Sequence, residues 1–515
     1  MEKATGETTA TVTVYDGENS IGGNKIHIES NGKGVLLDFG LNFKQMEKFY
    51  EEYLKPRSGR GLHDYLAMGL VPPIDVFQPE IFPTDIQGIG LHSVKVDALL
   101  LSHAHMDHAG CIGLLRRDIP IYCTPMSAAI LKAHRDAGRS ELHSEVVYST
   151  PREQLPDESR ILRAADYRKA NFVGRNFFLF GKPSKELQEF WKSCPAGRPL
   201  DPGIIEEAKE PPLPMIGFEV DHSIYGAAAF AIETDAGWIV YTGDLRLHGR
   251  MGEKTRKFVE EAAKLDPRLL IIEGTRMGEG RERQESEENV REKCLSAVSE
   301  EKGLVIADFS PRNFERLETF LTIAKETGRH LVVLAKDAYM LDAVRTVDGT
   351  DRMKEMMVYK ELKEDRFRWE GVVKEKFGEK FVDPREIARD PGRYILCFSF
   401  WDIKNLLDIR PSGGTYIYSS SEAHNEEDVF DFKRLWKWLE EFNLRTRGFQ
   451  MRRGRPVFEP GFHASGHASA DELLEIVEAI SPGIVIPVHT EHPSLFKRIL
   501  GARVKIPKKG KPIHL

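Results

Sequence analysis

Apolar runs that end in histidine or aspartate recur at four distant places in this chain. Short runs of this kind predict buried strands, and functional sites on sheet-based folds commonly collect at the carboxyl ends of strands. The runs "VDALLL", "FEVDH", "WIVYTGD" and "IVIPVH" lead to seven such side chains: His103, His105, Asp107, His108, His222, Asp244 and His489. We therefore expect a sheet-based fold that gathers them into one site.

The residue types in this set predict a metal centre. Imidazole and carboxylate groups suit Zn²⁺ or Mn²⁺, and structural zinc sites are usually rich in cysteine, which is absent from the set. Seven ligands are too many for one tetrahedral zinc ion, but they suit two ions that share a carboxylate. We expect two divalent metal ions, with Zn²⁺ favoured and Mn²⁺ as the alternative.

A chain of 515 residues is too long for one ordinary core, so we expect more than one lobe. Residues 9–40 alternate and then become continuously apolar, as in a β-meander. From about residue 251, buried-type strands such as "RLLIIEGTR" and "KGLVIADFS" alternate with amphipathic helices, which predicts a parallel α/β lobe. Residues 41–92 and 135–215 are interpreted as inserts, with a helix expected over "NFKQMEKFYEEYL".

Composition narrows the class of protein. The apolar stretches fall short of the roughly 20 residues that span a bilayer, and the start of the chain has no apolar signal core. Five scattered cysteines form no C-x-x-C pair, as expected in a reducing cytoplasm. The formal net charge is −7, so contact with nucleic acid would have to be local, for example at the arginines of "RTRGFQMRRGR".

The seven side chains, together with Asp38, resemble the ligand motifs of the metallo-β-lactamase superfamily in their chain order. The resemblance implies an αββα sandwich, a mixed α/β fold with two facing sheets. It implies one metal held by His103, His105 and His222, and a second held by Asp107, His108 and His489. Asp244 would bridge the two.

An α/β segment between Asp244 and His489 is similar to the inserted domain of the β-CASP nucleases. Their further motifs match Glu273 in "LLIIEGTR" and His467 in "SGH". The segments "HASGHASADEL" and "IPVHTE" resemble ribonuclease J, and the "IGGNKI" start and lobe lengths resemble its archaeal forms. The implied division is a metallo-β-lactamase domain over 1–250, a β-CASP domain over 251–460, and a return to the first domain over 461–515.

The resemblance implies a ribonuclease that hydrolyses phosphodiester bonds with a water activated by two metals. Asp107 would orient the nucleophile, and His467, held by Glu273, would protonate the departing ribose oxygen. A pocket for a terminal 5′-phosphate would favour 5′-to-3′ exonuclease action on single-stranded RNA, and it would be formed by His463, Ala464, Ser465, Gly466, His467 and Ser310.

Several alternatives remain open on the sequence alone. An endoribonuclease or a DNA nuclease of the same family would use the same ligands. A small-molecule metallohydrolase would need neither the α/β insert nor His467, and a non-catalytic RNA-binding scaffold would not need the complete ligand set. Relatives of ribonuclease J often dimerise, so a homodimer is also left open.

Overall fold

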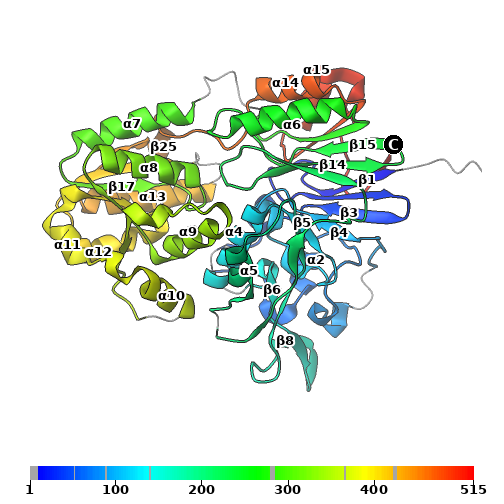
Figure 1. Cartoon of the computed structure of the whole chain (residues 1–515), viewed down its shortest axis with the longest axis horizontal. Helices are drawn as coiled ribbons and strands as arrows, with labels where there is room; N and C mark the ends of the chain where they lie inside the picture. The colour runs from blue at the N-terminus through cyan, green and yellow to red at the C-terminus, as the bar shows by residue number, and fades with distance from the viewer. Residues whose placement is uncertain are drawn as a thin grey trace, which may run out of the picture.

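The computed structural model describes residues 10–51, 53–86, 90–138, 141–195, 197–278, 285–364, 367–420 and 426–515, with the side chains of 426–430 left aside. Two sheets face each other on one side of the molecule, and a third sheet forms a separate lobe beside them (Figure 1). None of the helices in the described ranges has the length and hydropathy to cross a membrane. The expected mixed α/β architecture with an αββα sandwich is confirmed.

The first sheet contains the predicted meander. Its strands β1 (Thr11–Asp16), β2 (Lys25–Ser30) and β3 (Lys33–Leu37) pair antiparallel in sequence. Parallel pairing then adds β4 (Ala98–Leu100), β5 (Ile121–Cys123), β10 (Phe177–Leu179) and β12 (Ile205–Glu207), while β27 (Pro512–His514) closes the other edge.

The second sheet has five strands, in the order β13 (Met215–Glu219), β14 (Ala228–Thr234), β15 (Gly237–Tyr241), β16 (Leu269–Glu273) and β26 (Ile484–Val488). A buried cluster between the two sheets includes Val12 and Leu100 from the first and Phe230, Ile271 and Ile486 from the second. The outer face of the second sheet packs on α6 (Gly252–Lys264), α14 (Ala470–Ile480) and α15 (Pro493–Leu500).

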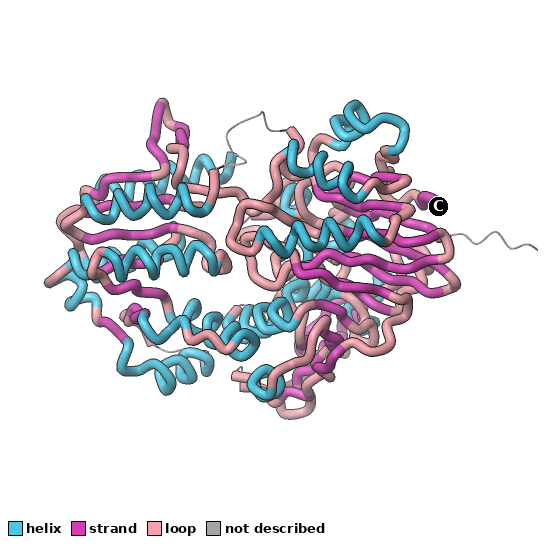
Figure 2. Tube along the Cα trace, turned by 45° about the horizontal axis from the view of Figure 1, so that its top comes forward, coloured by secondary structure: helices cyan, strands magenta, loops and turns pink. Residues whose placement is uncertain are grey.

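The third sheet is entirely parallel among its described pairings, as the alternation of strands and helices predicts. Its order is β20 (Phe381–Val382), β19 (Met356–Tyr359), β18 (His330–Val333), β21 (Tyr394–Cys397), β17 (Leu304–Asp308), β22 (Gly414–Tyr418) and β23 (Leu444–Arg447). Figure 2 shows helices on both faces of these strands. The helices of this lobe include α7 (Glu287–Glu300), α8 (Phe314–Glu326), α9 (Ala335–Asp348), α10 (Arg368–Phe377) and α13 (Glu426–Glu441).

One strand lies in a different sheet from the one we expected. The run "RLLIIEGTR" was assigned to the α/β lobe, but its strand β16 pairs in parallel with β15 and β26 of the second sheet. The physical reason is that a strand buried on both faces has the same continuous apolar pattern in either sheet, so the pattern alone cannot choose between them. The strand ends at Glu273, and its place beside β26 brings that carboxylate close to the end of the strand that precedes His489.

The inserts form small elements around the first sheet. The helix expected over residues 42–54 is reduced to α1 (Phe43–Met46), followed by α2 (His63–Ala67). Between 135 and 215 lie the hairpin β7 (Arg152–Leu155) and β8 (Glu158–Ala164), and a small sheet of β6 (Tyr148–Ser149), β9 (Phe172–Gly174) and β11 (Leu200–Asp201).

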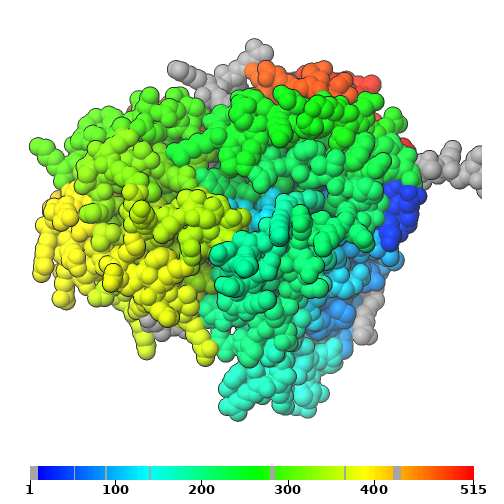
Figure 3. All heavy atoms as spheres, in the orientation of Figure 1, coloured from blue at the N-terminus to red at the C-terminus, as the bar shows by residue number. Residues whose placement is uncertain are grey.

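Two helices join the sandwich to the α/β lobe. Both α4 (Pro125–Ala137) and α5 (Lys185–Lys192) pack against α9, and the Ser184 hydroxyl donates to the Thr346 carbonyl. Figure 3 shows the atoms of the two lobes in contact along this seam. The side of the sandwich that carries α4 and α5 therefore faces the α/β lobe.

Candidate metal centre

The histidine-rich loop leaves β4 and turns at once into the short helix α3 (Met106–Ala109). The chain after β3 holds this loop from one side, because Phe39 N–H donates to the His108 carbonyl (2.8 Å) and Leu41 N–H to that of Met106 (2.9 Å). Gly40 between them allows the approach, since a Cβ at that position would lie 1.6 Å from the Asp107 carbonyl oxygen. The loop conformation is thus fixed by backbone contacts that leave its side chains free to point into the site.

Three of the predicted ligands form a histidine cluster. His103 Nε2 lies 3.1 Å from His105 Nδ1, and His222 Nε2 lies 3.2 Å from the same atom. Burial lowers the pKa of all three imidazoles, that of His105 to about 4. Neutral imidazoles with nitrogen atoms converging on one point are the form in which histidine binds metals.

The other four predicted ligands form a second cluster directly beside the first. Their ligand atoms all lie within 4.8 Å of one another. Asp107 Oδ2 is 3.2 Å from His489 Nε2, and Asp244 Oδ2 is 3.0 Å from His108 Nε2. Asp244 Oδ2 is also 3.7 Å from His103 Nε2, so this carboxylate lies between the two clusters.

The chemistry of the donors fits divalent cations. Asp244 Oδ1 is buried and has no hydrogen-bond partner among the described residues. A buried carboxylate oxygen without a partner costs free energy, and a metal ion at that position would satisfy it. The imidazoles and carboxylates gathered here are ligands for Zn²⁺ and Mn²⁺. The set is therefore suited to divalent metal binding, and the number and kind of ions remain predictions.

Asp38 holds the second cluster in place through His108, on the side of that ring that faces away from Asp244. Its carboxylate accepts from Ser102 N–H (2.7 Å), the Ser102 hydroxyl (2.8 Å), the Tyr241 hydroxyl (2.6 Å) and His108 Nδ1 (2.7 Å). The bond to Nδ1 places the proton of a neutral His108 on Nδ1, which would leave the Nε2 lone pair for a metal ion. Asp38 has a φ of 55°, a left-handed conformation that only the surrounding contacts make acceptable.

Two further predicted ligands are oriented through the ring nitrogen that faces away from the site. His489 Nδ1 lies 2.8 Å from the Thr275 hydroxyl, and His222 Nδ1 donates to the Gly466 carbonyl at 2.5 Å. Sequence reasoning noted Asp38 but missed Ser102, Tyr241 and Thr275. Only their positions could have indicated a role. Ser102 directly precedes His103, Thr275 lies two residues after Glu273, and Tyr241 ends the strand that leads to Asp244.

His467 and Glu273 lie together at the edge of this centre. His467 Nδ1 is 3.0 and 3.1 Å from the two Glu273 carboxylate oxygens and 3.9 Å from Asp244 Oδ2. Burial lowers the pKa of His467, but the carboxylates of Glu273 and Asp244 outweigh burial and raise it to about 9. The pair thus offers a protonated imidazole beside the predicted ligands.

The segment from His463 to His467 leads into α14. Ser469 caps this helix and forms a capping box with Glu472. The Ser465 hydroxyl accepts from His467 N–H at 3.1 Å, and the Ser465 carbonyl accepts from Arg246 at 3.1 Å. A Cβ on Gly466 would lie 2.9 Å from the Ser223 hydroxyl, so glycine permits the close approach to the loop of His222.

Two other predicted groups lie apart from this segment. Ser310 is exposed, and no hydrogen bond in the described ranges joins its hydroxyl to residues 463–467. Of the arginines in "RTRGFQMRRGR", Arg445 pairs with Glu301 (2.8 Å) and Arg447 with Glu300 (3.0 Å). The remaining arginines lie on or next to the hairpin of β24 (Phe449–Arg452) and β25 (Arg455–Phe458).

Comparisons with known proteins identify the fold family. A family model described as a beta-lactamase superfamily domain matches residues 72–161, and one described as a Zn-dependent metallo-hydrolase RNA specificity domain matches residues 461–507. Ribonuclease J of Pyrococcus abyssi is 22% identical over 496 residues, which cover 92% of this chain and 88% of that protein. The chain resembles the ribonuclease J proteins and, in these two segments, the metallo-β-lactamase superfamily.

Other ribonuclease J-like proteins share the same overall length or extend beyond it. Ribonuclease J of Methanocaldococcus jannaschii is 20% identical, with 93% of this chain and 90% of that protein covered. Ribonuclease J of Sinorhizobium meliloti is 24% identical, but the match spans only 61% of that protein. A crystal structure of an Enterococcus faecalis protein of unknown function matches 98% of this chain with a TM-score of 0.69 and 21% identity, and it supports the fold alone.

The matches confirm the predicted resemblance to the metallo-β-lactamase and β-CASP proteins. The first family model also covers part of each of the two inserts that the sequence motifs alone could not align. The second begins just before the His463–His467 segment and ends beyond His489.

Proposed function

We propose that this chain is a metal-dependent ribonuclease that hydrolyses RNA phosphodiester bonds with two divalent cations. The observation that carries the proposal is the placement of His467 and Glu273 beside Asp244, at the edge of a site that gathers all seven predicted ligands. The names of the relatives and the RNA specificity domain support RNA as the substrate. A hydrolase of small molecules would need neither the pair of His467 and Glu273 nor the α/β lobe.

The proposed roles follow from the positions of the side chains. When bound, divalent cations lower the pKa of a water molecule and offset the negative charge of a phosphate group. Asp107 is held by His489 and is positioned to orient the attacking water. His467, protonated through its pair with Glu273, is placed to donate a proton to the departing ribose oxygen. Because water attacks, the products carry a 5′-phosphate and a 3′-hydroxyl.

We further propose 5′-to-3′ exonuclease action on RNA with a 5′-monophosphate end. Residues 463–467 precede the capped start of α14, and backbone N–H groups at such a turn favour an anion. The hydroxyl of Ser465, the imidazoles of His463 and His467, and the backbone of Ala464 and Gly466 would hold the terminal phosphate. The exposed Ser310 hydroxyl, after β17, would be an added contact of this pocket.

The test uses one RNA sequence with a 5′-monophosphate, a 5′-triphosphate or a 5′-hydroxyl end. Each is incubated with the full chain in Zn²⁺ or Mn²⁺, and the products are sized. We expect mononucleotides from the 5′-monophosphate RNA alone. Internal fragments from all three RNAs would establish an endonuclease instead, and equal cleavage of single-stranded DNA would contradict the preference for RNA.

Two variants show that the activity belongs to this site. Asp244→Asn should abolish cleavage, which excludes a contaminating nuclease. His467→Ala should lower kcat by about 100-fold to 10,000-fold with unchanged metal content. Loss of metal from His467→Ala would show that this residue is a ligand and not a proton donor.

A further inference from the structure

A cavity of about 350 Å³ opens beside the metal loop and takes no part in the site described above. It is formed by three regions far apart in sequence: the insert around α1, the helix α4 with residues 141–144 that follow it, and the first turn of α9 in the α/β lobe. Met106, which lies between the predicted ligands His105 and Asp107, is part of its wall. No residue of the 463–467 segment lines it, so it is separate from the proposed terminal-phosphate pocket.

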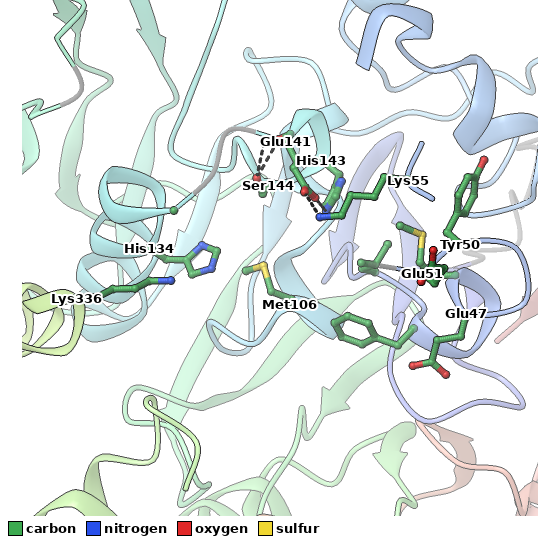
Figure 4. Close-up of a pocket in the computed structure, with 14 residues that line it drawn as sticks. Glu47, Tyr50, Glu51, Lys55, Met106, His134, Glu141, His143, Ser144 and Lys336 are labelled. Carbon is green, nitrogen blue, oxygen red and sulfur yellow. Dashed lines mark hydrogen bonds and ion pairs between the residues drawn. The ribbon is translucent and has the colours of Figure 1, made fainter. Parts of the chain in front are cut away.

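One end of the cavity is basic. Figure 4 shows Lys336 and His134 together at this end, with Met106 between them and the opposite wall. The Lys336 side chain is exposed and forms no ion pair with any described residue. Burial, followed by the positive charges of Arg312 and Lys336, lowers the pKa of His134 to about 3, so His134 is a neutral hydrogen-bonding group at neutral pH.

Arg312 does not line the cavity, but its positive charge acts on His134 and it lies beside the loop that carries predicted metal ligands. Its guanidinium donates one long hydrogen bond, of 3.4 Å, to the Ala104 carbonyl of the metal loop. No carboxylate of the described ranges lies within ion-pair distance of it, although burial disfavours its charge and lowers its pKa. A partly desolvated guanidinium with no carboxylate beside it can bind an anion, and this one lies next to the predicted metal loop.

The rest of the wall is largely apolar and includes aromatic rings. Phe43 in α1 is 44% exposed, and Tyr50, Met46 and Met106 are half-buried around the cavity. Acidic side chains, among them Glu47 and Glu51, lie at the end opposite Lys336 (Figure 4). A flat aromatic and thioether surface beside a cationic end matches a ligand with a planar ring and one phosphate group.

We propose that this cavity is a nucleotide subsite, which holds a base against Phe43 and Met106 and a backbone phosphate at Lys336, with the charge of Arg312 nearby. The inference rests on the proposed ribonuclease function and adds a substrate contact on the 3′ side of the scissile bond. A volume of about 350 Å³ is within the range of small-ligand pockets. The RNA strand would then pass from the 463–467 pocket, across the metal centre, to the α4–α9 seam.

The subsite predicts two separable effects on cleavage of a 10-nucleotide, 5′-monophosphorylated RNA. Lys336→Ala should raise KM by about threefold to tenfold and reduce the slope of log KM against log salt by about 0.7, the value for one lost phosphate contact on a single strand. Phe43→Ala should raise KM by about tenfold through lost stacking, with an unchanged salt slope. Lys404→Ala, an exposed lysine of the same lobe outside the cavity, is the matched control and should behave as wild type.

The outcomes separate the subsite from the function on which it rests. If wild type cleaves the RNA and both variants keep its KM and salt slope, the subsite is wrong and the ribonuclease proposal stands. If wild type cleaves no RNA, the function is wrong, and binding of the same RNA to wild type and Lys336→Ala decides the subsite by itself. Equal binding would then overturn it. Thermal denaturation of each variant shows that the fold is intact.

Discussion

Arg246 and Glu287 form a buried ion pair of 3.0 Å that joins the loop after Asp244 to the first turn of α7. The same guanidinium reaches Glu315 at 2.6 Å and Asp221 at 3.3 Å, and Arg316 binds Glu287 from the other side at 3.0 Å. Asp221 directly precedes the predicted ligand His222. The loops that carry two predicted ligands are thus tied to the α/β lobe by one network of buried charges.

Replacing Arg246 should lower the stability of the fold more than replacing an exposed charged residue does. Arg246→Met leaves three buried carboxylates without this partner, and breaking a buried pair from one side typically costs about 3–5 kcal/mol. We expect a large fall in the thermal denaturation midpoint. Arg256→Met, which breaks an exposed pair with Glu253, should leave the midpoint unchanged. Equal midpoints for the two variants would show that the network does not hold the lobes together.

The ligand positions were the most predictable part of the site. Each predicted ligand follows an apolar run, and the strand ends of the two sheets bring all seven together with His467 and Glu273 nearby. Whether each binds the metal assigned to it remains a prediction. Ser102 and Tyr241 could not be predicted, because serine and tyrosine at strand ends have many ordinary roles and nothing local links them to Asp38.

Parts of the fold that depend on long-range packing were less predictable. The sheet membership of β16 is decided by its neighbours β15 and β26, the second of which lies more than 200 residues later. The cavity beside Met106 combines residues near 43, 134 and 336, and no local pattern indicates that these meet. The helix expected over residues 42–54 is short. Phe43, Met46 and Tyr50 line that cavity, but Phe49, Tyr53 and Leu54 are exposed, so the segment has no continuous buried face.

Asp38 should control metal affinity without touching the metals. In Asp38→Asn, the carboxylate that accepts from His108 Nδ1 is replaced by a neutral amide, so the His108 ring is held less firmly and is less basic. Changes of such supporting groups typically cost about 10-fold to 100-fold in metal affinity. Competition with a chromophoric chelator measures this loss. Asp118→Asn, on the surface, is the control, and unchanged affinity in Asp38→Asn would contradict the role.

Glu273 should affect the rate of cleavage and not the metal content. Glu273→Gln removes the negative charge that favours protonated His467, while the amide can still accept a hydrogen bond. We expect kcat to fall by about 10-fold to 1,000-fold with little change in KM. The exposed Glu475→Gln on α14 should keep full activity. A variant that loses metal along with activity would place Glu273 among the groups that hold the metal site and not in proton transfer.

Metal removal should lower stability as well as activity. Without cations, the site holds the Asp107 and Asp244 carboxylates beside the neutral imidazoles of His103, His105 and His222 in a small buried volume. Binding to the folded state alone stabilises it by about 4 kcal/mol at a metal concentration 1,000 times Kd. A chelator should therefore lower the denaturation midpoint of wild type and have a smaller effect on His489→Ala. Metal analysis of the untreated protein tests the expected two ions per chain.

Asp308 predicts a pH dependence that arises away from the metal centre. Burial raises the pKa of this carboxyl group to about 7, and the Tyr416 hydroxyl that it binds offsets only part of the effect. The unfolded chain binds the Asp308 proton with an ordinary pKa of about 4, so the folded state holds that proton over a wider pH range. The protonated Asp308 therefore contributes fully to the free energy of unfolding below pH 4. This contribution is lost as the pH rises from 4 through 7, by up to about 4 kcal/mol.

Asp308→Asn keeps a neutral side chain at every pH and should remove this loss. The difference between the denaturation midpoints of the variant and wild type should therefore grow from pH 5 to pH 8, with the variant the more stable at the upper end. All other titrating groups are shared and cancel in the difference. Asp390→Asn, which changes an exposed carboxylate of the same lobe, should show no such trend. A difference that stays constant over this range would mean that Asp308 is ionised in the folded protein throughout, with a stronger hydrogen-bond donor than Tyr416 beside it.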